Sequence, residues 1–213
     1  MGQLTPSAEA FRQQRRAFWM RQLHQWHWIS SALCLIGLLL FALTGITLNH
    51  ARQIEATPRV TQRNATLPIS LRAAVGGEDE RKAALPAAVA AWLDDSLRVR
   101  VAGRTAEWSA GEIYLSLPRP GSDDWLSIDR VNGAVEYEST RRGAIAYLND
   151  LHKGRNTGPT WSWFIDVFAL ACLVFALTGL FLLKIHAVRR ASTWPLVTLG
   201  LVLPVLLALI FIH

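Results

Sequence analysis

The hydrophobic residues of this chain are concentrated in three stretches that contain almost no charge. They run from Ile29 to Leu48, from Phe164 to Leu183 and from Pro195 to Ile212, so two are 20 residues long and the third is 18. A helix needs about 20 apolar residues to cross the hydrocarbon core of a bilayer. The pattern therefore predicts an α-helical membrane protein with three transmembrane helices, and it excludes a soluble cytosolic enzyme.

Between the first two stretches the pattern becomes that of a small α+β domain. Residues 86–93 combine alanine with helical apolar spacing, and Pro86 suits a first helical turn. Val131-Asn132-Gly133 predicts a hairpin turn, because Asn-Gly tolerates positive φ at both central positions. Period-two alternation predicts four strands, at residues 97–102, 112–117, 125–129 and 134–138. We find no nucleophile–base pair, phosphate loop or clustered metal ligands in this segment.

Charge sets the expected orientation. The net charge of +6 comes from the short segments before the first span and after the second, whereas residues 50–161 hold 15 basic and 14 acidic residues. Short loops rich in Lys and Arg stay in the cytoplasm, so we expect no nucleic-acid groove. The organisation is a cytoplasmic basic arm at 1–28, spans at 29–49, 161–184 and 194–213, an outer domain at 50–160 and a cytoplasmic basic loop at 185–193.

The two cysteines lie inside spans. Helical rise places Cys34 roughly 9 Å and Cys172 roughly 18 Å from the inner face. We therefore expect the two thiols at different depths, as small buried residues without a disulfide.

Five of the six histidines lie near the ends of the first two spans. His24 and His27 precede span one and His50 follows it, while His152 precedes span two and His186 follows it. An ionisable group at a membrane edge often has only a structural role, because its side chain can reach water there. Their arrangement favours a functional role, because it repeats.

The repeat is inverted. The first copy consists of Leu23-His24, Trp26-His27-Trp28, Phe41-Ala42-Leu43-Thr44-Gly45 and His50. The second copy, in the same order, consists of Leu151-His152, Trp161-Ser162-Trp163, Phe175-Ala176-Leu177-Thr178-Gly179 and His186. The two copies cross the membrane in opposite directions, and inverted repeats place binding sites between their halves. Thr-Gly also allows close helix packing, and we expect that role as well.

Inversion brings His50 together with His152 at the outer face, and His24 or His27 together with His186 at the inner face. Low-spin haem iron takes axial imidazoles from opposite sides. The pairs therefore predict one or two b haems, the inner one bound by either His24 or His27.

Other residues are expected to support these haems. Arg52 and Arg155 adjoin the outer pair and suit haem propionates, since Arg binds carboxylate bidentately; Arg21, Lys184 and Arg189 adjoin the inner pair. We expect Asp166, Thr44 and Thr178 to orient the ligands. An ion pair of Asp166 with Arg155 or Arg52 is the structural alternative.

Several of these residues also resemble a known family. The chain resembles the PepSY-associated transmembrane family in four features. These are Leu23-His24-Gln25-Trp26, the two Leu-Thr-Gly segments, Leu151-His152-Lys153-Gly154, and Asp129 followed by Asn132-Gly133 and Val135. The resemblance implies a bacterial inner-membrane protein with a periplasmic PepSY-like domain, and some members are haem-binding reductases of ferric siderophores. Larger relatives have four or more spans.

The expected function is haem-dependent electron transfer from a cytoplasmic or quinol donor to a periplasmic acceptor, with a ferric chelate favoured over a redox protein. No dinucleotide fingerprint is present, so a flavin or nicotinamide would sit on a partner. Three spans, of which two carry ligands, are compatible with a homodimer in the lipid bilayer. The alternatives are a cofactor-free regulatory or scaffolding protein that binds a peptide, protease or partner subunit by strand addition, and a structural subunit of a larger complex.

Overall fold

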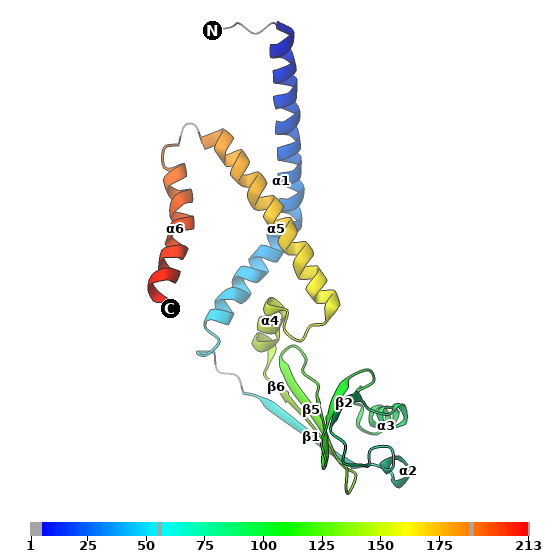
Figure 1. Ribbon diagram of the computed structural model, residues 1–213. Coiled ribbons are helices and arrows are strands. Elements are labelled where there is room, and N and C mark those ends of the chain that lie inside the picture. Colours follow the sequence, from blue (N-terminus) through cyan, green and yellow to red (C-terminus); the bar gives the residue numbers. More distant parts are fainter. Residues whose placement is uncertain (1–5, 55–56, 188–189, 213) are drawn as a thin grey trace. The chain divides into compact units, whose positions relative to one another are not determined.

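A computed structural model describes residues 6–54, 57–187 and 190–212 (Figure 1). Arg189 and His213, as well as the outer part of the arm, lie outside the described residues. The described chain divides into two compact units, one formed by residues 1–39 and 165–213 and the other by residues 40–164. The division cuts through two long helices, so each unit contains part of both. The units are described separately below.

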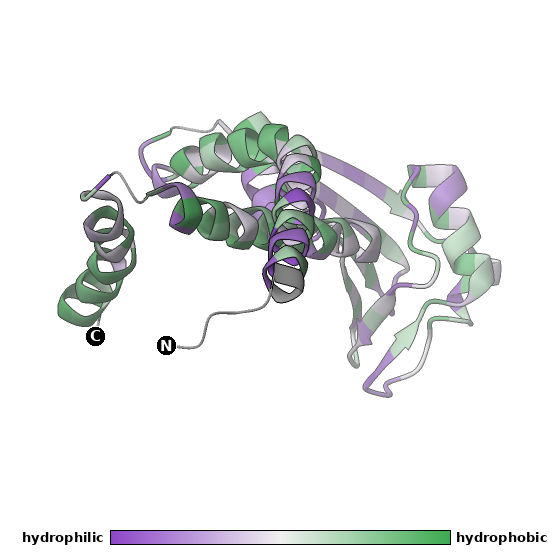
Figure 2. Ribbon diagram, turned by 90° about the horizontal axis from the view of Figure 1, so that it is seen from above, coloured by the Kyte–Doolittle hydropathy of each residue, from purple (hydrophilic) through white to green (hydrophobic). Residues whose placement is uncertain are grey.

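Three long helices match the three predicted spans. They are α1 (Pro6–Asn49), α5 (Pro159–His186) and α6 (Thr193–Phe211), and all three contain a window long and apolar enough to cross a membrane. Figure 2 shows that most residues of α6 are hydrophobic. A helix that is apolar all round needs a lipid or protein environment. The chain is therefore a multi-pass membrane protein whose helices contact the bilayer.

Helix α1 is longer than its apolar stretch. It begins at Pro6, so the described part of the basic arm belongs to the same helix as the span. Arg12, Arg15 and Arg16 are exposed on this extension. The arm has few helix breakers, and its Ala, Gln and Arg residues are good helix formers.

The other secondary structure forms one six-stranded antiparallel sheet with the order β1-β6-β5-β4-β3-β2. In chain order the strands follow α1 and precede α4 (Ala144–Lys153), with α2 (Ile69–Arg72) and α3 (Ala87–Leu97) among them. The strands are β1 (Arg59–Thr66), β2 (Arg81–Ala84), β3 (Thr105–Trp108), β4 (Glu112–Ser116), β5 (Ser122–Asp129) and β6 (Ala134–Arg141).

One face of the sheet carries the core. Ile113, Leu115, Leu126 and Ile128 alternate with polar residues along β4 and β5, and they are fully buried. They form one hydrophobic cluster with the apolar side of α3, which contributes Val89, Ala90, Leu93 and Leu97. The alternation is typical of a sheet that is covered on one face only. The domain contains no cysteine, so this core is its main source of stability.

The structure confirms the predicted hairpin, but the conformation of its turn differs from the predicted one. Strands β5 and β6 pair as antiparallel neighbours, but only Gly133 has positive φ in the turn. The Asp129 carboxylate instead accepts hydrogen bonds from the backbone N–H groups of Asn132 and Val131. These bonds hold the pKa of Asp129 below its ordinary value.

Other local predictions differ from the structure. The helix at 86–93 is confirmed as α3, which continues to Leu97 with Pro86 as its N-cap. The strand predicted at 97–102 is wrong, because Leu97 ends the helix and Arg98 adopts a left-handed conformation with φ 55°. Strands β1, β2 and β3 were not predicted. Six of the eight residues of β1 are polar or charged, and β2 and β3 have four residues each, so period-two alternation is weak there.

The polar end of the core face is organised by a buried carboxylate. Asp124 is only 4% exposed, and its oxygens accept hydrogen bonds from the hydroxyl groups of Ser122, Ser139 and Tyr137 and from the guanidinium of Arg119. Burial alone would raise the pKa of Asp124, but the bonds from Ser122, Ser139 and Arg119 outweigh it, so the pKa lies below its ordinary value.

We expect the stability of the sheet domain to depend on the charge of Asp124. Because the folded-state pKa is lowered, this contribution is complete above the unfolded value of about 4 and is lost as the pH falls through the folded value. Asp124→Asn should therefore lower the unfolding temperature at pH 7 and flatten its fall below about pH 4. Tryptophan fluorescence melts of the full chain measure this, with exposed Asp94→Asn as control. A wild-type pH profile in Asp124→Asn would contradict the assignment.

Candidate functional site: imidazole contacts on the spanning helices

Within the unit formed by residues 1–39 and 165–213, His27 of α1 lies against the repeat motif of α5. Its Nδ1 is 3.1 Å from Thr178 Oγ1, and its ring stacks on Phe175 with centroids 4.9 Å apart and planes 16° apart. A Cβ built on Gly179 would lie 3.1 Å from His27 Cε1, so a larger residue would crowd the ring. Three of the five motif residues, Phe175, Thr178 and Gly179, therefore form the contact surface for one imidazole.

The same contacts occur in the unit formed by residues 40–164, with the roles of the two halves exchanged. His152 of α4 places Nδ1 2.7 Å from Thr44 Oγ1 of α1. Its ring centroid is 4.9 Å from that of Phe41, and a Cβ on Gly45 would be 3.7 Å from His152 Cε1. In both copies, a histidine outside the motif packs on its Phe, Thr and Gly.

The two threonines fix the protonation of their histidines. Thr44 Oγ1 lies 2.9 Å from the Leu40 carbonyl oxygen and Thr178 Oγ1 lies 2.7 Å from that of Val174. A carbonyl oxygen can only accept, so each hydroxyl donates to its own helix and accepts from the imidazole. His27 and His152 thus donate from Nδ1, and in the neutral ring Nε2 carries the lone pair.

Three other histidines share this tautomer through a different acceptor. Nδ1 of His24, His50 and His186 lies 2.8, 2.9 and 2.8 Å from the backbone carbonyl oxygens of Met20, Ile46 and Leu182, each four residues earlier. Nδ1 must donate in all three cases. An imidazole held in this way has Nε2 as its remaining nitrogen for a further contact.

His24 and His186 also lie close to each other. Their ring centroids are 6.0 Å apart and their planes are at 89°, and both side chains are exposed. Metal–imidazole bonds are about 2.0–2.1 Å long, so two rings on opposite sides of one metal ion have centres roughly 6 Å apart. Of the two inner histidines, His24 is therefore paired with His186, whereas His27 is engaged by Thr178.

The predicted outer residues are less closely grouped. Among the described residues, no hydrogen bond or ring contact joins His50 to His152. Arg155 lines a cavity of about 590 Å³ together with Arg142 and Lys153. Arg52 is exposed, and no hydrogen bond or ion pair of its side chain is found in the described part of the chain.

The inner basic residues and the acid within the span are also exposed. Arg21, Lys184 and Asp166 face outward, and none of the three forms a side-chain hydrogen bond or ion pair within residues 6–54, 57–187 and 190–212. Neither the predicted orienting role of Asp166 nor its predicted ion pair corresponds to a contact there.

Helix α4 is the element that holds His152 in place. Asn149 and Asp150 are buried on it. Asn149 forms a 2.9 Å hydrogen bond with Thr47 of α1, while the Asp150 carboxylate accepts from the Gly121 backbone N–H and from the Arg142 guanidinium. One short helix is thereby bonded to both α1 and the sheet, which fixes the position of the imidazole.

No group of three or more His, Cys, Asp or Glu residues that could hold a metal ion occurs in the described ranges. His24 and His186 supply only two imidazoles, so a metal ion held between them would need its other ligands from water or from another molecule.

The two cysteines are neighbours, contrary to the depths expected from helical rise. Cys34 is fully buried, and its thiol lies close enough to Cys172 to interact with it. The expected depths assumed that both apolar stretches end level at the inner face, and the proximity of the two thiols contradicts that assumption. A Cβ on Gly37 would overlap the ring of Phe168, so the small residues Cys34 and Gly37 permit a close approach of α1 and α5.

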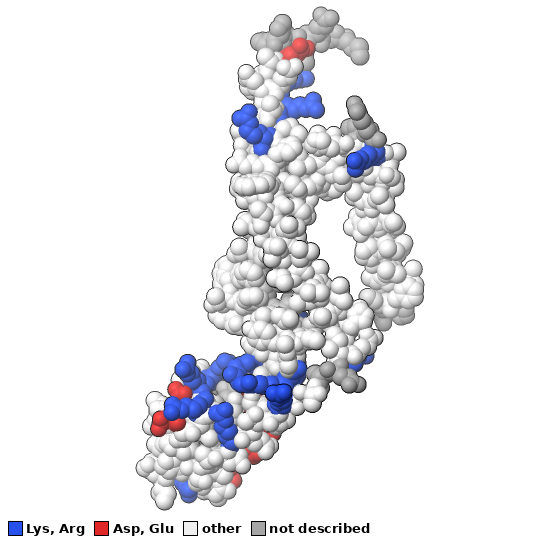
Figure 3. Space-filling view, turned by 180° about the vertical axis from the view of Figure 1, so that it is seen from behind, with Lys and Arg blue, Asp and Glu red and all other residues white. Residues whose placement is uncertain are grey.

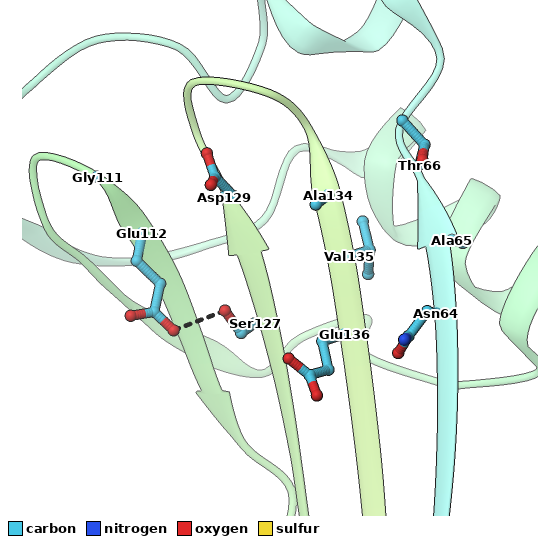
Figure 4. A pocket seen from close by; sticks show the side chains of 10 residues that line it. All are labelled: Asn64, Ala65, Thr66, Gly111, Glu112, Ser127, Asp129, Ala134, Val135 and Glu136. Carbon is cyan, nitrogen blue, oxygen red and sulfur yellow. Dashed lines mark hydrogen bonds between the residues drawn. The ribbon is translucent and has the colours of Figure 1, made fainter.

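A groove of about 570 Å³ lies on the open face of the sheet and contains several acidic side chains (Figure 4). Glu112 accepts a 2.6 Å hydrogen bond from the Ser127 hydroxyl, and Asp129 is occupied by the hairpin turn. The carboxylates of Glu112 and Asp129 are therefore both bonded within the domain.

We expect the threonine–histidine contacts to stabilise the folded protein. Thr44→Val and Thr178→Val keep the side-chain shape but remove the acceptor of an imidazole N–H. Each should cost about 1 kcal/mol, the usual size of a side-chain hydrogen bond within a membrane protein. Thermal unfolding in detergent measures the loss, and Thr198→Val on an exposed position of α6 is the matched control. Equal stability of all three variants would contradict a role of these contacts.

Comparison with known proteins gives a family match only. No curated protein and no solved structure shows significant similarity to the chain. A family described as "Putative PepSY_TM-like" matches residues 18–213, which includes both repeat copies and all three spanning helices. The chain belongs to this PepSY-associated transmembrane family.

Proposed function

We propose that this protein binds haem b and transfers electrons across the bacterial inner membrane to a periplasmic acceptor. The observation that carries the proposal is the pair His24 and His186, with ring centroids 6.0 Å apart. Both rings have Nδ1 bound to a backbone carbonyl oxygen, which leaves both Nε2 atoms free. This combination suits two axial ligands of one iron.

Haem would supply reversible one-electron chemistry at this site, and the chain would supply its binding and orientation. The carbonyl oxygens of Met20 and Leu182 restrain the two rings and increase the basicity of Nε2. Arg21 and Lys184 lie within one helical turn of the ligands in sequence and would neutralise propionates.

A second haem would use the outer pair, His50 and His152. Both rings carry their proton on Nδ1, through Ile46 and Thr44 respectively, so both present a free Nε2. Arg52 and Arg155 are the cationic residues proposed for its propionates. Bringing His50 to His152 would require a rearrangement at the end of α1.

The proposed topology follows from the basic segments. Arg12, Arg15, Arg16, Arg21 and the basic loop after α5 would stay in the cytoplasm. The sheet domain, between the first and second spans, would then be a periplasmic PepSY-like module, with the C-terminus on the same side. Electrons would come from a cytoplasmic or quinol donor, and a ferric chelate is the proposed acceptor. A homodimer would be compatible with three spans.

A second candidate function is cofactor-free binding of a peptide or partner subunit. The observation that favours it is β1, an edge strand of eight residues of which seven are exposed. An extended peptide can add to such an edge through main-chain hydrogen bonds. Arg59 and Arg63 on β1 oppose this reading, since charged residues protect edge strands from pairing.

Absorption spectroscopy tests the haem proposal. The full chain, purified from a haem-replete host, should show a Soret band that shifts on reduction with dithionite. His24→Ala and His186→Ala should each remove the inner haem and lower the haem-to-protein ratio by about half, if two haems bind. His50→Ala and His152→Ala should remove the other half.

Exposed Gln25→Ala, next to His24, is the matched control and should keep the full ratio. Circular dichroism of each variant establishes that the helices persist. Absence of a Soret band from the wild type, or an unchanged band in His24→Ala and His186→Ala, would reject the inner haem and favour the second candidate.

A further inference from the structure

A second feature of the sheet domain concerns its basic side chains. Arginines from four separate segments surround a cavity of about 140 Å³, here called the arginine basin. Figure 3 shows Lys and Arg side chains gathered at one end of the domain. The basin is formed by Arg63, Arg98, Arg119 and Arg141, with Thr61, Tyr137 and Ser139 completing its lining.

Strand register explains how these residues meet. Arg63 of β1 pairs with Tyr137 of β6, and Arg141 of β6 pairs with Ser122 of β5. Paired residues project to the same face of a sheet, so both arginines share the face that also buries Tyr137 and Ser122. At its end, this face therefore changes from apolar core to cationic surface.

The other two arginines come from loops. Arg119 lies in the turn that precedes β5. Arg98 follows α3 in a left-handed conformation with φ 55°, a position where glycine is the usual residue. Arginine is less favourable than glycine in this left-handed backbone conformation. The Arg98 side chain lines the basin.

The basin has far more positive than negative charge. Asp124 is the carboxylate beneath it, and it binds Arg119 together with three hydroxyl groups. Arg63 donates to the Leu97 carbonyl oxygen, which is uncharged, and lies over the Tyr137 ring at 5.7 Å. Arg98 and Arg141 form no side-chain hydrogen bond or ion pair with any residue that the structure describes.

Among the described residues, no carboxylate therefore pairs with the guanidinium groups of Arg63, Arg98 and Arg141 around this cavity. Like charges at such separations repel, and a bound anion with two negative charges would relieve the repulsion. Guanidinium forks match the oxygens of phosphate and carboxylate groups. The volume of about 140 Å³ is several times the roughly 30 Å³ of a water molecule, so it suits a single tetrahedral oxyanion.

We propose that the arginine basin is a binding site for a phosphate group, held by Arg63, Arg98, Arg119 and Arg141. The phosphate could belong to a soluble phosphate compound or to the headgroup of an anionic lipid, since β1 begins ten residues after α1 ends and the basin lies near that end of the sheet. The site is independent of haem binding.

The test uses the full chain in phosphatidylcholine nanodiscs, with inorganic phosphate as the probe. Calorimetric titration should show saturable binding, and phosphate should raise the unfolding temperature. Arg98→Gln with Arg141→Gln should weaken phosphate binding at least about tenfold, because two charge-assisted contacts are lost. Arg141→Lys keeps the charge but removes the fork, and should give an intermediate loss.

Arg104→Gln is the matched control, because Arg104 is exposed and lies outside the basin; its phosphate affinity should stay within about twofold of the wild type. In phosphate-free buffer the double variant should unfold no earlier than the wild type, since its like-charge repulsion is reduced. This result also shows that the double variant is folded.

A parallel set in phosphatidylglycerol nanodiscs distinguishes the two sources. Binding of free phosphate in phosphatidylcholine supports a soluble ligand. A rise in unfolding temperature that requires phosphatidylglycerol and is lost in the double variant supports a lipid headgroup. Absence of both effects in the wild type, or an equal loss in Arg104→Gln, would overturn the proposal.

Discussion

A contact between an imidazole and a Phe-x-x-Thr-Gly surface occurs in each copy of the repeat, and in one copy it joins two spanning helices, α1 and α5. In lipid, apolar side chains gain nothing by leaving one apolar environment for another, so helix association relies on close packing and polar contacts. The repeat supplies both, because glycine allows close approach, phenylalanine provides a flat surface and threonine accepts the ring N–H. His27 and His152 are each held in this way.

The same interaction has a chemical consequence for the histidines. A threonine hydroxyl or a backbone carbonyl oxygen accepts from Nδ1 in all five, so all five leave Nε2 free. His24 and His186 combine this with proximity, whereas His27 packs against Phe175. The contacts of the repeat thus distinguish two nearby histidines of α1. His27 joins the helices, whereas His24 is not held by the repeat.

Much of this could be predicted from residue order, because membrane spans, the β5–β6 hairpin and the repeat are all local patterns. The assignment between His24 and His27 could not, since both lie on the same helix near its inner end, and only the position of α5 distinguishes them. Strand β1 was missed because its polar residues face outward on an edge strand. The arginine basin was missed for another reason: Arg63 and Arg141 are 78 positions apart, and only the pairing of β1 with β6 brings them to one face.

The reciprocal contacts of His27 and His152 limit which substitutions each half of the chain can tolerate independently of the other. Thr178 belongs to one half and serves a histidine of the other, and Thr44 does the reverse. A substitution of either threonine therefore removes a contact made by a histidine of the other half. A change in one copy would therefore be compensated most directly by a change in the other copy.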